Sequence, residues 1–161
     1  MDSLSLTNNP FAVLTAVAGP AVLTNASSVL ALGTGNRLAR VVDRTRFVAN
    51  ELAGLDPASA EHAGWTRQLR ALQVRAQLLL KALRVIYASL GAFATAALVS
   101  VIGSVAAYYG EQHLFQAFAI VALGTGTFAV AALASGCVFM VRETRLAVQS
   151  LSEEAALRSR S

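Results

Sequence analysis

The chain has 161 residues, of which 55% are hydrophobic and only 14% are charged. Soluble domains carry roughly 25% charged residues, so this composition argues against an ordinary soluble domain. The formal net charge of +4 could indicate a nucleic-acid-binding protein. The distribution of the basic residues along the chain indicates membrane topology instead. We therefore expect no nucleic-acid partner.

Three long runs contain no Asp, Glu, Lys or Arg, namely 3–36, 85–110 and 112–141. A helix of about 20 apolar residues crosses a hydrocarbon core of about 30 Å. The sequence therefore predicts an all-α integral membrane protein with one membrane domain over 1–161. Its three transmembrane helices are expected near 11–33, 85–108 and 114–140.

The first predicted span is the most polar of the three. Pro20 lies near its centre and is followed by four small polar residues, Thr24, Asn25, Ser27 and Ser28. An asparagine at membrane depth needs a hydrogen-bonding partner, because hydrocarbon offers none. Two interpretations stay open: these side chains bond across helices, or they line a water-filled pore.

Helical periodicity continues beyond this span, over about 36–84. Two apolar stripes recur at three- and four-residue spacing; they are Leu38, Val41, Val42, Thr45, Val48 and Leu52, then Trp65, Leu69, Leu72, Ala76, Leu79 and Leu83. Between the stripes, Gly54 is expected to end one helix, with Asp56 as N-cap and Pro57 as first residue of the next. The stripes predict a cytoplasmic antiparallel helical hairpin that extends helices 1 and 2.

The second span carries a small residue at every fourth position: Ala88, Ala92, Ala96, Ser100 and Ser104. Residues four apart lie along one stripe of a helix. Small residues on such a stripe let another helix approach closely. We expect this stripe to pack against a helix and the opposite surface, with Leu90, Phe93 and Val101, to face lipid or bulkier groups.

The third span contains Gly124-Thr125-Gly126-Thr127-Phe128-Ala129, which fits the loose dinucleotide pattern G-x-G-x-x-A. A pyrophosphate site needs a preceding strand and an open helix N-terminus. Apolar helix flanks these glycines on both sides instead. We expect Gly124 and Gly126 to serve helix packing, and no cofactor to bind.

All 13 Lys and Arg lie in two segments, nine in 34–84 and four in 142–161. Basic segments stay on the cytoplasmic side. The topology expected is an outside N-terminus, a cytoplasmic 36–84 hairpin, a short outer turn and a cytoplasmic C-terminal helix or tail over 142–161.

The run from Pro20, PAVLTNASSVLALGTGNRLARVVDRTR, is similar to the DUF2721 family of small bacterial three-helix integral membrane proteins. Its most specific piece is Asn36-Arg37-Leu38-Ala39-Arg40-Val41-Val42-Asp43-Arg44. Also similar are Arg75, Leu78 and Ala82 before the second span and the RETRLA segment at 142–147 after the third. The resemblance implies a multi-pass protein of the bacterial inner membrane. The family is defined by an uncharacterised domain, so the resemblance implies no reaction.

A basic cluster is expected at the cytoplasmic ends of the spans, comprising Asn36, Arg37, Arg40, Arg44, Lys81 and Arg84. Asp43 and Glu143 are candidates for ion pairs with neighbouring arginines. Three interpretations stay open: anchoring at anionic lipid headgroups, a charged ring at a pore mouth, or a docking site for a cytosolic protein.

Residues for catalysis are scarce. The predicted spans contain no carboxylate, Lys or Arg, and the two histidines, His62 and His113, fall in separate turns. No metal-ligand set or nucleophile–base pair is apparent in this pattern. We therefore expect no enzyme activity and no metal.

Two functions fit this pattern. The first is a homo-oligomeric pore or channel-like assembly in the lipid bilayer, with the polar first span near its axis and a basic cytoplasmic mouth. The alternative is a non-conducting, membrane-anchored scaffold whose hairpin binds a cytosolic protein partner.

Overall fold

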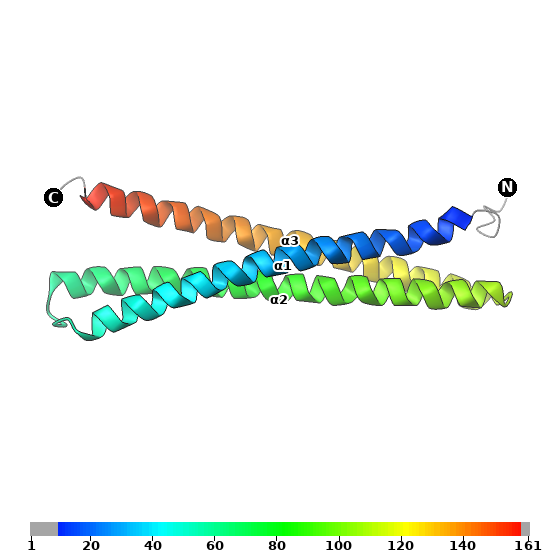
Figure 1. The fold of residues 1–161 in the computed structure, drawn as a ribbon, viewed down its shortest axis with the longest axis horizontal. Helices are drawn as coiled ribbons and strands as arrows, with labels where there is room; N and C mark the ends of the chain where they lie inside the picture. Colours follow the sequence, from blue (N-terminus) through cyan, green and yellow to red (C-terminus); the bar gives the residue numbers. More distant parts are fainter. Residues whose placement is uncertain (1–9, 159–161) are drawn as a thin grey trace. The chain divides into compact units, whose positions relative to one another are not determined.

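The computed structural model of the chain describes the backbone of residues 10–158 and the side chains of residues 18–149. Three helices follow one another: α1 (Pro10–Ala53), α2 (Ala60–Tyr108) and α3 (Gln112–Arg158) (Figure 1). No strand occurs over 10–158, so the predicted all-α class is confirmed there. No break separates the predicted third span from the predicted C-terminal helix, because α3 is one 47-residue helix. The side chains of 11–17 and 150–161 lie outside the described residues.

The chain forms two compact units, and each helix contributes to both. Unit 1 comprises Met1–Leu30 and Val85–Ala134, and unit 2 comprises Ala31–Arg84 and Ser135–Ser161. Charge divides in the same way: all 13 Lys and Arg belong to unit 2, whereas unit 1 has only Asp2 and Glu111 as acidic residues. The units therefore follow the charge-free runs and the basic segments of the sequence.

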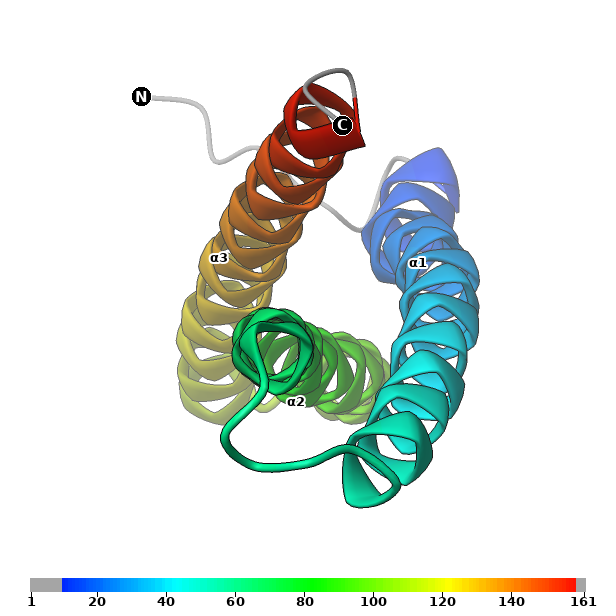
Figure 2. The same ribbon diagram turned by 90° about the vertical axis from the view of Figure 1, so that its left-hand side faces the viewer.

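A six-residue turn joins α1 to α2 and lies nearest the viewer in Figure 2. As predicted, α1 ends just before Gly54. The N-cap prediction is wrong, because the amide of His62 donates to Oγ of Ser59 at 3.0 Å, which makes Ser59 the cap of α2. Asp56 instead accepts from the amide of Ala58 at 3.0 Å within the turn. This bond forms an Asx turn, and because the Asp56 side chain is engaged in it, Asp56 does not cap the helix.

A short turn joins α2 to α3, and a C-terminal cap ends α2 there. Gly110 has a φ of +79°, a left-handed conformation that glycine adopts without steric cost. The amide of Glu111 donates to the carbonyl of Ala106 at 3.1 Å, and the amide of Gly110 to that of Ala107 at 3.1 Å. This pair of bonds is a Schellman motif, and it fixes Tyr108 as the last residue of α2.

The core of unit 1 lies on one face of α2. Ile86, Ser89, Phe93 and Ala96 are buried there, and the hydroxyl of Ser89 donates to the carbonyl of Ala129 on α3 at 2.8 Å. Of the predicted small-residue stripe, Ala96 is buried, Ala92, Ser100 and Ser104 are half-buried, and Ala88 is exposed. The contact face is thus rotated toward Phe93, which was expected on the opposite surface. A three-four alternation of buried positions replaces strict fours, as the 3.6-residue period requires.

Glycine permits one close approach within unit 1. A Cβ atom placed on Gly103 would lie 3.0 Å from Cβ of Phe118 on α3, whereas one on Gly124 or Gly126 would meet nothing within 4 Å. Close packing inside the chain therefore occurs at Gly103 and not at the two predicted glycines. A packing role for Gly124 and Gly126 needs a surface outside this chain and stays a prediction.

The core of unit 2 joins the two predicted stripes. Val41 and Val48 of α1 and Leu72 and Leu79 of α2 form one buried cluster. Around it pack the partly buried side chains of Leu38, Trp65, Leu69 and Ala76. Trp65 is the single tryptophan of the chain, so its fluorescence reports on this core.

Two helices, α2 and α3, contain stretches long and apolar enough to cross a membrane. Only 6% of the apolar stretch in α3 is buried within the chain, so most of its side chains, such as Ile120 and Leu123, are exposed. The described residues of α1 contain no stretch that is equally long and apolar. Its apolar run is interrupted there by the Thr24–Ser28 polar residues, which lower the average hydropathy.

Replacing Leu79 by Ala should lower the free energy of unfolding of unit 2 by about 2–5 kcal/mol, because the side chain is fully buried. Leu80→Ala is the matched control, since Leu80 is 41% exposed, and should cost less than about 1 kcal/mol. Denaturant unfolding in detergent micelles, followed by Trp65 fluorescence, measures both. Equal losses in the two variants would contradict the assigned core.

Gly103→Leu should lower the stability of unit 1 by about 1–3 kcal/mol, because the added side chain collides with Phe118. Gly124→Leu enters open space and should leave stability unchanged or raise it by up to about 1 kcal/mol, since Leu favours a helix over Gly. Thermal unfolding followed by circular dichroism at a helix-sensitive wavelength measures both variants. A stable Gly103→Leu protein would refute the close contact.

Candidate functional site

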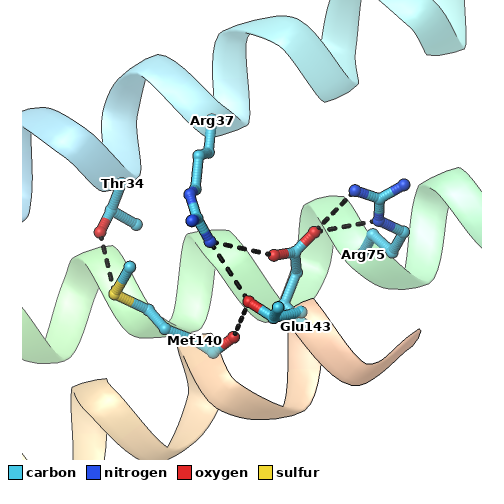
Figure 3. A network of polar contacts seen from close by, with 6 residues as sticks. Thr34, Arg37, Arg75, Met140 and Glu143 are labelled. Carbon is cyan, nitrogen blue, oxygen red and sulfur yellow. Dashed lines mark hydrogen bonds and ion pairs between the residues drawn. The ribbon is translucent and has the colours of Figure 1, made fainter. Parts of the chain in front are cut away.

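The most distinctive polar group of unit 2 is the carboxylate of Glu143, on α3. Glu143 is only 3% exposed, and it is the one buried charged residue among the described side chains. Arg75 of α2 donates from Nε to Oε1 at 3.0 Å, and its Nη2 lies 2.9 Å from the same oxygen. Nη1 of Arg37, on α1, lies 3.8 Å from Oε2. The carboxylate thus meets one arginine from each of the other two helices (Figure 3).

The local sequence explains this convergence. Leu72, Arg75 and Leu79 follow one another at three- and four-residue spacing, so Arg75 lies on the apolar stripe of α2. The aliphatic stem of an arginine can cover an apolar surface while its guanidinium reaches a polar group. Burial of a carboxylate is costly unless it is paired with an opposite charge and hydrogen-bonded. Arg75 supplies both the positive charge and the hydrogen bond.

Further bonds hold α1 and α3 together around Glu143. Nη1 of Arg37 donates to Oγ1 of Thr144 at 3.3 Å, and the Thr144 hydroxyl donates to the carbonyl of Met140 at 3.0 Å. One turn before Arg37, the buried hydroxyl of Thr34 donates to Sδ of Met140 at 3.2 Å. These contacts, drawn in Figure 3, fix the rotation of α3 against α1 within unit 2.

An open pocket of about 390 Å³ adjoins this network. Its polar lining comprises Arg37, Arg40, Arg44, Arg75, Glu143 and Thr144, and its apolar lining comprises Val41, Leu72 and Ala147. Four guanidinium groups therefore share one pocket with a single carboxylate. Even with Glu143 ionised, the lining keeps an excess of positive charge.

Arg40 and Arg44, the two lining arginines that do not pair with Glu143, differ in their surroundings. Arg44 lies over the ring of Phe47, with Cζ 5.0 Å from the ring centroid, a cation–π contact. Phe47 in turn contacts Trp65, with ring centroids 6.5 Å apart. Arg40 is exposed, and its side chain has no ion-pair or hydrogen-bond partner among residues 18–149.

The structure separates the predicted basic cluster into two groups. Arg37, Arg40 and Arg44 line the pocket, whereas Asn36, Lys81 and Arg84 are exposed and do not. Asp43 lies 4.0 Å from Arg46, and both side chains are at least 75% exposed. Such a surface pair contributes little to stability.

Arg75 is the site residue that sequence reasoning missed. In the sequence, Arg75 belongs only to the family resemblance, and the partners expected for Glu143 are neighbouring arginines. The signal was available in the sequence, because a lone arginine on the Leu72–Leu79 stripe must find a polar partner. The identity of that partner depends on how α3 is rotated.

The polar residues of the first predicted span behave differently from one another. The hydroxyls of Thr24, Ser27 and Ser28 each donate to the carbonyl four residues earlier on α1, at 2.8, 2.7 and 2.9 Å. The side chain of Asn25 is exposed and makes no hydrogen bond with the described residues. The hydroxyls are thus satisfied by their own helix, whereas the Asn25 side chain has no partner among residues 18–149.

Among the described residues, no group of three or more His, Cys, Asp or Glu side chains could hold a metal ion. The site is therefore a set of arginines around one carboxylate. Arginines of this kind can pair with a carboxylate of another helix or with an external anion.

These features define an all-α protein with two apolar candidate membrane helices and a basic helical unit. The family model described as "Protein of unknown function (DUF2721)" matches residues 17–153, and the chain belongs to this family. No curated protein and no solved structure matches it. The match includes all of the residues that line the pocket.

Glu143→Gln should lower the free energy of unfolding of unit 2 by about 1–3 kcal/mol, because Arg75 loses its charged partner in a buried position. The matched control is Asp43→Asn, which breaks the exposed pair with Arg46 and should cost less than about 1 kcal/mol. Unfolding followed by Trp65 fluorescence measures both. If the two losses are equal, the Glu143 ion pair does not stabilise the unit.

Proposed function

We propose that this protein spans the membrane three times and assembles as a homo-oligomeric, pore-like complex with the first helices near its axis. Its N-terminus lies outside and its C-terminus in the cytoplasm. The segregation of all 13 Lys and Arg in unit 2 supports this orientation, because basic segments are retained on the cytoplasmic side. The apolar stretches of α2 and α3 supply two of the spans.

The single observation that carries the proposal is Asn25. Its amide is exposed on α1 and unpartnered within the described chain, while its polar neighbours are satisfied by their own helix. An amide at membrane depth cannot remain in hydrocarbon without a partner, because the unsatisfied group costs several kcal/mol. Water along an axis between copies of α1 satisfies both its donors and its acceptor.

Exposed apolar surface supports assembly in a bilayer. On α1, Val29 and Leu32 are 66% and 68% exposed, and they flank the polar residues. Surfaces of this kind need lipid or another copy of the chain as a neighbour. A second copy can cover the apolar residues of α1 while its polar face turns toward water.

The test combines assembly and flux for Asn25→Leu. The pore account predicts an unchanged subunit count by native mass spectrometry of detergent-released protein. It also predicts that ion flux from liposomes falls by about tenfold or more, because the water-filled path loses a polar group from its lining. Val29→Leu, an apolar exchange on the same helix, should leave both unchanged.

Two results would contradict the pore. A monomer or dimer has too few first helices to enclose water. The other result is no ion flux from liposomes that contain the wild-type protein, together with weaker assembly of Asn25→Leu. The Asn25 amide would then serve helix association. The scaffold alternative, in which the cytoplasmic hairpin binds a protein, would then replace the pore.

A further inference from the structure

We propose that the open pocket of unit 2 binds the phosphate group of an anionic ligand through Arg37, Arg40, Arg44 and Arg75. The inference rests on the geometry of unit 2 alone and does not depend on the proposed pore. The ligand class is a phosphate ester or a phospholipid headgroup, which share the same recognised group.

The charge of the pocket is the first argument. Four arginines line it, and Glu143 is the only acidic residue in the lining. Both oxygens of that carboxylate face guanidinium groups, Oε1 facing Arg75 and Oε2 facing Arg37. Glu143 thus compensates one positive charge and leaves an excess of positive charge along the open pocket, which favours a multiply charged anion.

The second argument is the availability of donors. Arg40 is exposed and has no partner among the described residues, and Arg44 has a cation–π contact with Phe47 but no hydrogen-bond or ion-pair partner among them. Residues 37, 40 and 44 lie on one side of α1 at three- and four-residue spacing. The N–H groups of Arg40 and Arg44 are therefore available to an anion, and Arg37 lies beside them on the same side of the helix.

The third argument concerns how the site is held. The ion pair with Glu143 fixes Arg75 on one wall, and Arg37 is held by Thr144 at 3.3 Å. Arginine forks ordered in advance bind an anion with less loss of conformational freedom. Glu143 acts here as a positioning residue for the two arginines.

Size and chemistry narrow the ligand. The pocket volume of about 390 Å³ lies near the lower end of the about 300–1,000 Å³ typical of small-molecule sites, so it suits one headgroup or a small ester rather than a folded partner. Planar guanidinium forks match phosphate oxygens in a bidentate manner. The walls of Val41, Leu72 and Ala147 can receive the apolar part of an ester.

The experiment uses the full chain, delipidated in maltoside micelles that contain no phosphate. In one arm, inorganic phosphate is titrated in by calorimetry. In the other arm, phosphatidylglycerol is added, and bound lipid is counted by native mass spectrometry against diacylglycerol, which lacks the phosphate. Binding in the first arm identifies a free phosphate compound as a ligand, and binding in the second arm alone identifies a lipid headgroup.

The decisive variant is the double substitution Arg40→Gln/Arg44→Gln, which leaves the Glu143 ion pairs in place. It should weaken binding by at least about tenfold, since two charged donors are lost. Arg67→Gln/Arg70→Gln removes the same charge from exposed positions of α2 outside the pocket, and should weaken binding by less than about twofold. If the double variant fails to fold, Arg40→Gln alone should still weaken binding by about threefold.

Two outcomes would overturn the proposal. One is the absence of binding in both arms. The other is an equal loss in the pocket variant and in Arg67→Gln/Arg70→Gln, which would reduce the effect to the general positive charge of unit 2.

Discussion

The burial of one carboxylate determines how the basic unit of this protein is built. Glu143 lies on α3, and its ion pair with Arg75 at 2.9 Å joins α3 to α2, while Arg37 approaches from α1. A buried ion pair adds little net stability over a well-packed apolar pair, but removal of one partner is costly. In this structure the rotation of α3 brings the carboxylate within reach of both arginines.

The pocket follows from the same constraint. With Arg37 and Arg75 drawn to Glu143, Arg40 and Arg44 remain on the adjoining turns of α1 without acidic partners in the described chain. The carboxylate thus organises an excess of positive charge instead of cancelling it. In unit 1 the corresponding contacts are apolar or backbone-directed, as with Phe93 and the bond of Ser89 to Ala129, because almost no charge is present there.

Much of this arrangement could be predicted from the sequence, because it depends on local patterns. Charge-free runs and helical periodicity predict three helices, Gly54 predicts the end of the first, and the stripes that include Val48 and Leu79 form the core of unit 2. The remainder depends on side-chain competition and helix rotation. Ser59 caps α2 because Asp56 is engaged in the turn.

Pairing between distant residues was the hardest feature to predict. Arg75 and Glu143 are 68 residues apart, and no local rule connects an arginine on one apolar stripe to a carboxylate on another helix. The burial of Phe93 was not predicted either. Residues at spacings of three and four, counted from Ile86, define the contact face of α2 more accurately than residues at spacings of four alone. These contacts require the mutual rotation of helices, which periodicity leaves undetermined.

The central claim, that Glu143 and Arg75 act as one unit, is tested most directly by a double-mutant cycle. The free energy of unfolding is measured by Trp65 fluorescence for the wild type, Arg75→Gln, Glu143→Gln and the double variant. The account predicts a coupling energy of about 1–3 kcal/mol, because residues in one hydrogen-bonded pair are not independent. A coupling energy below about 0.3 kcal/mol, as for independent sites, would contradict the claim that this ion pair organises the basic unit.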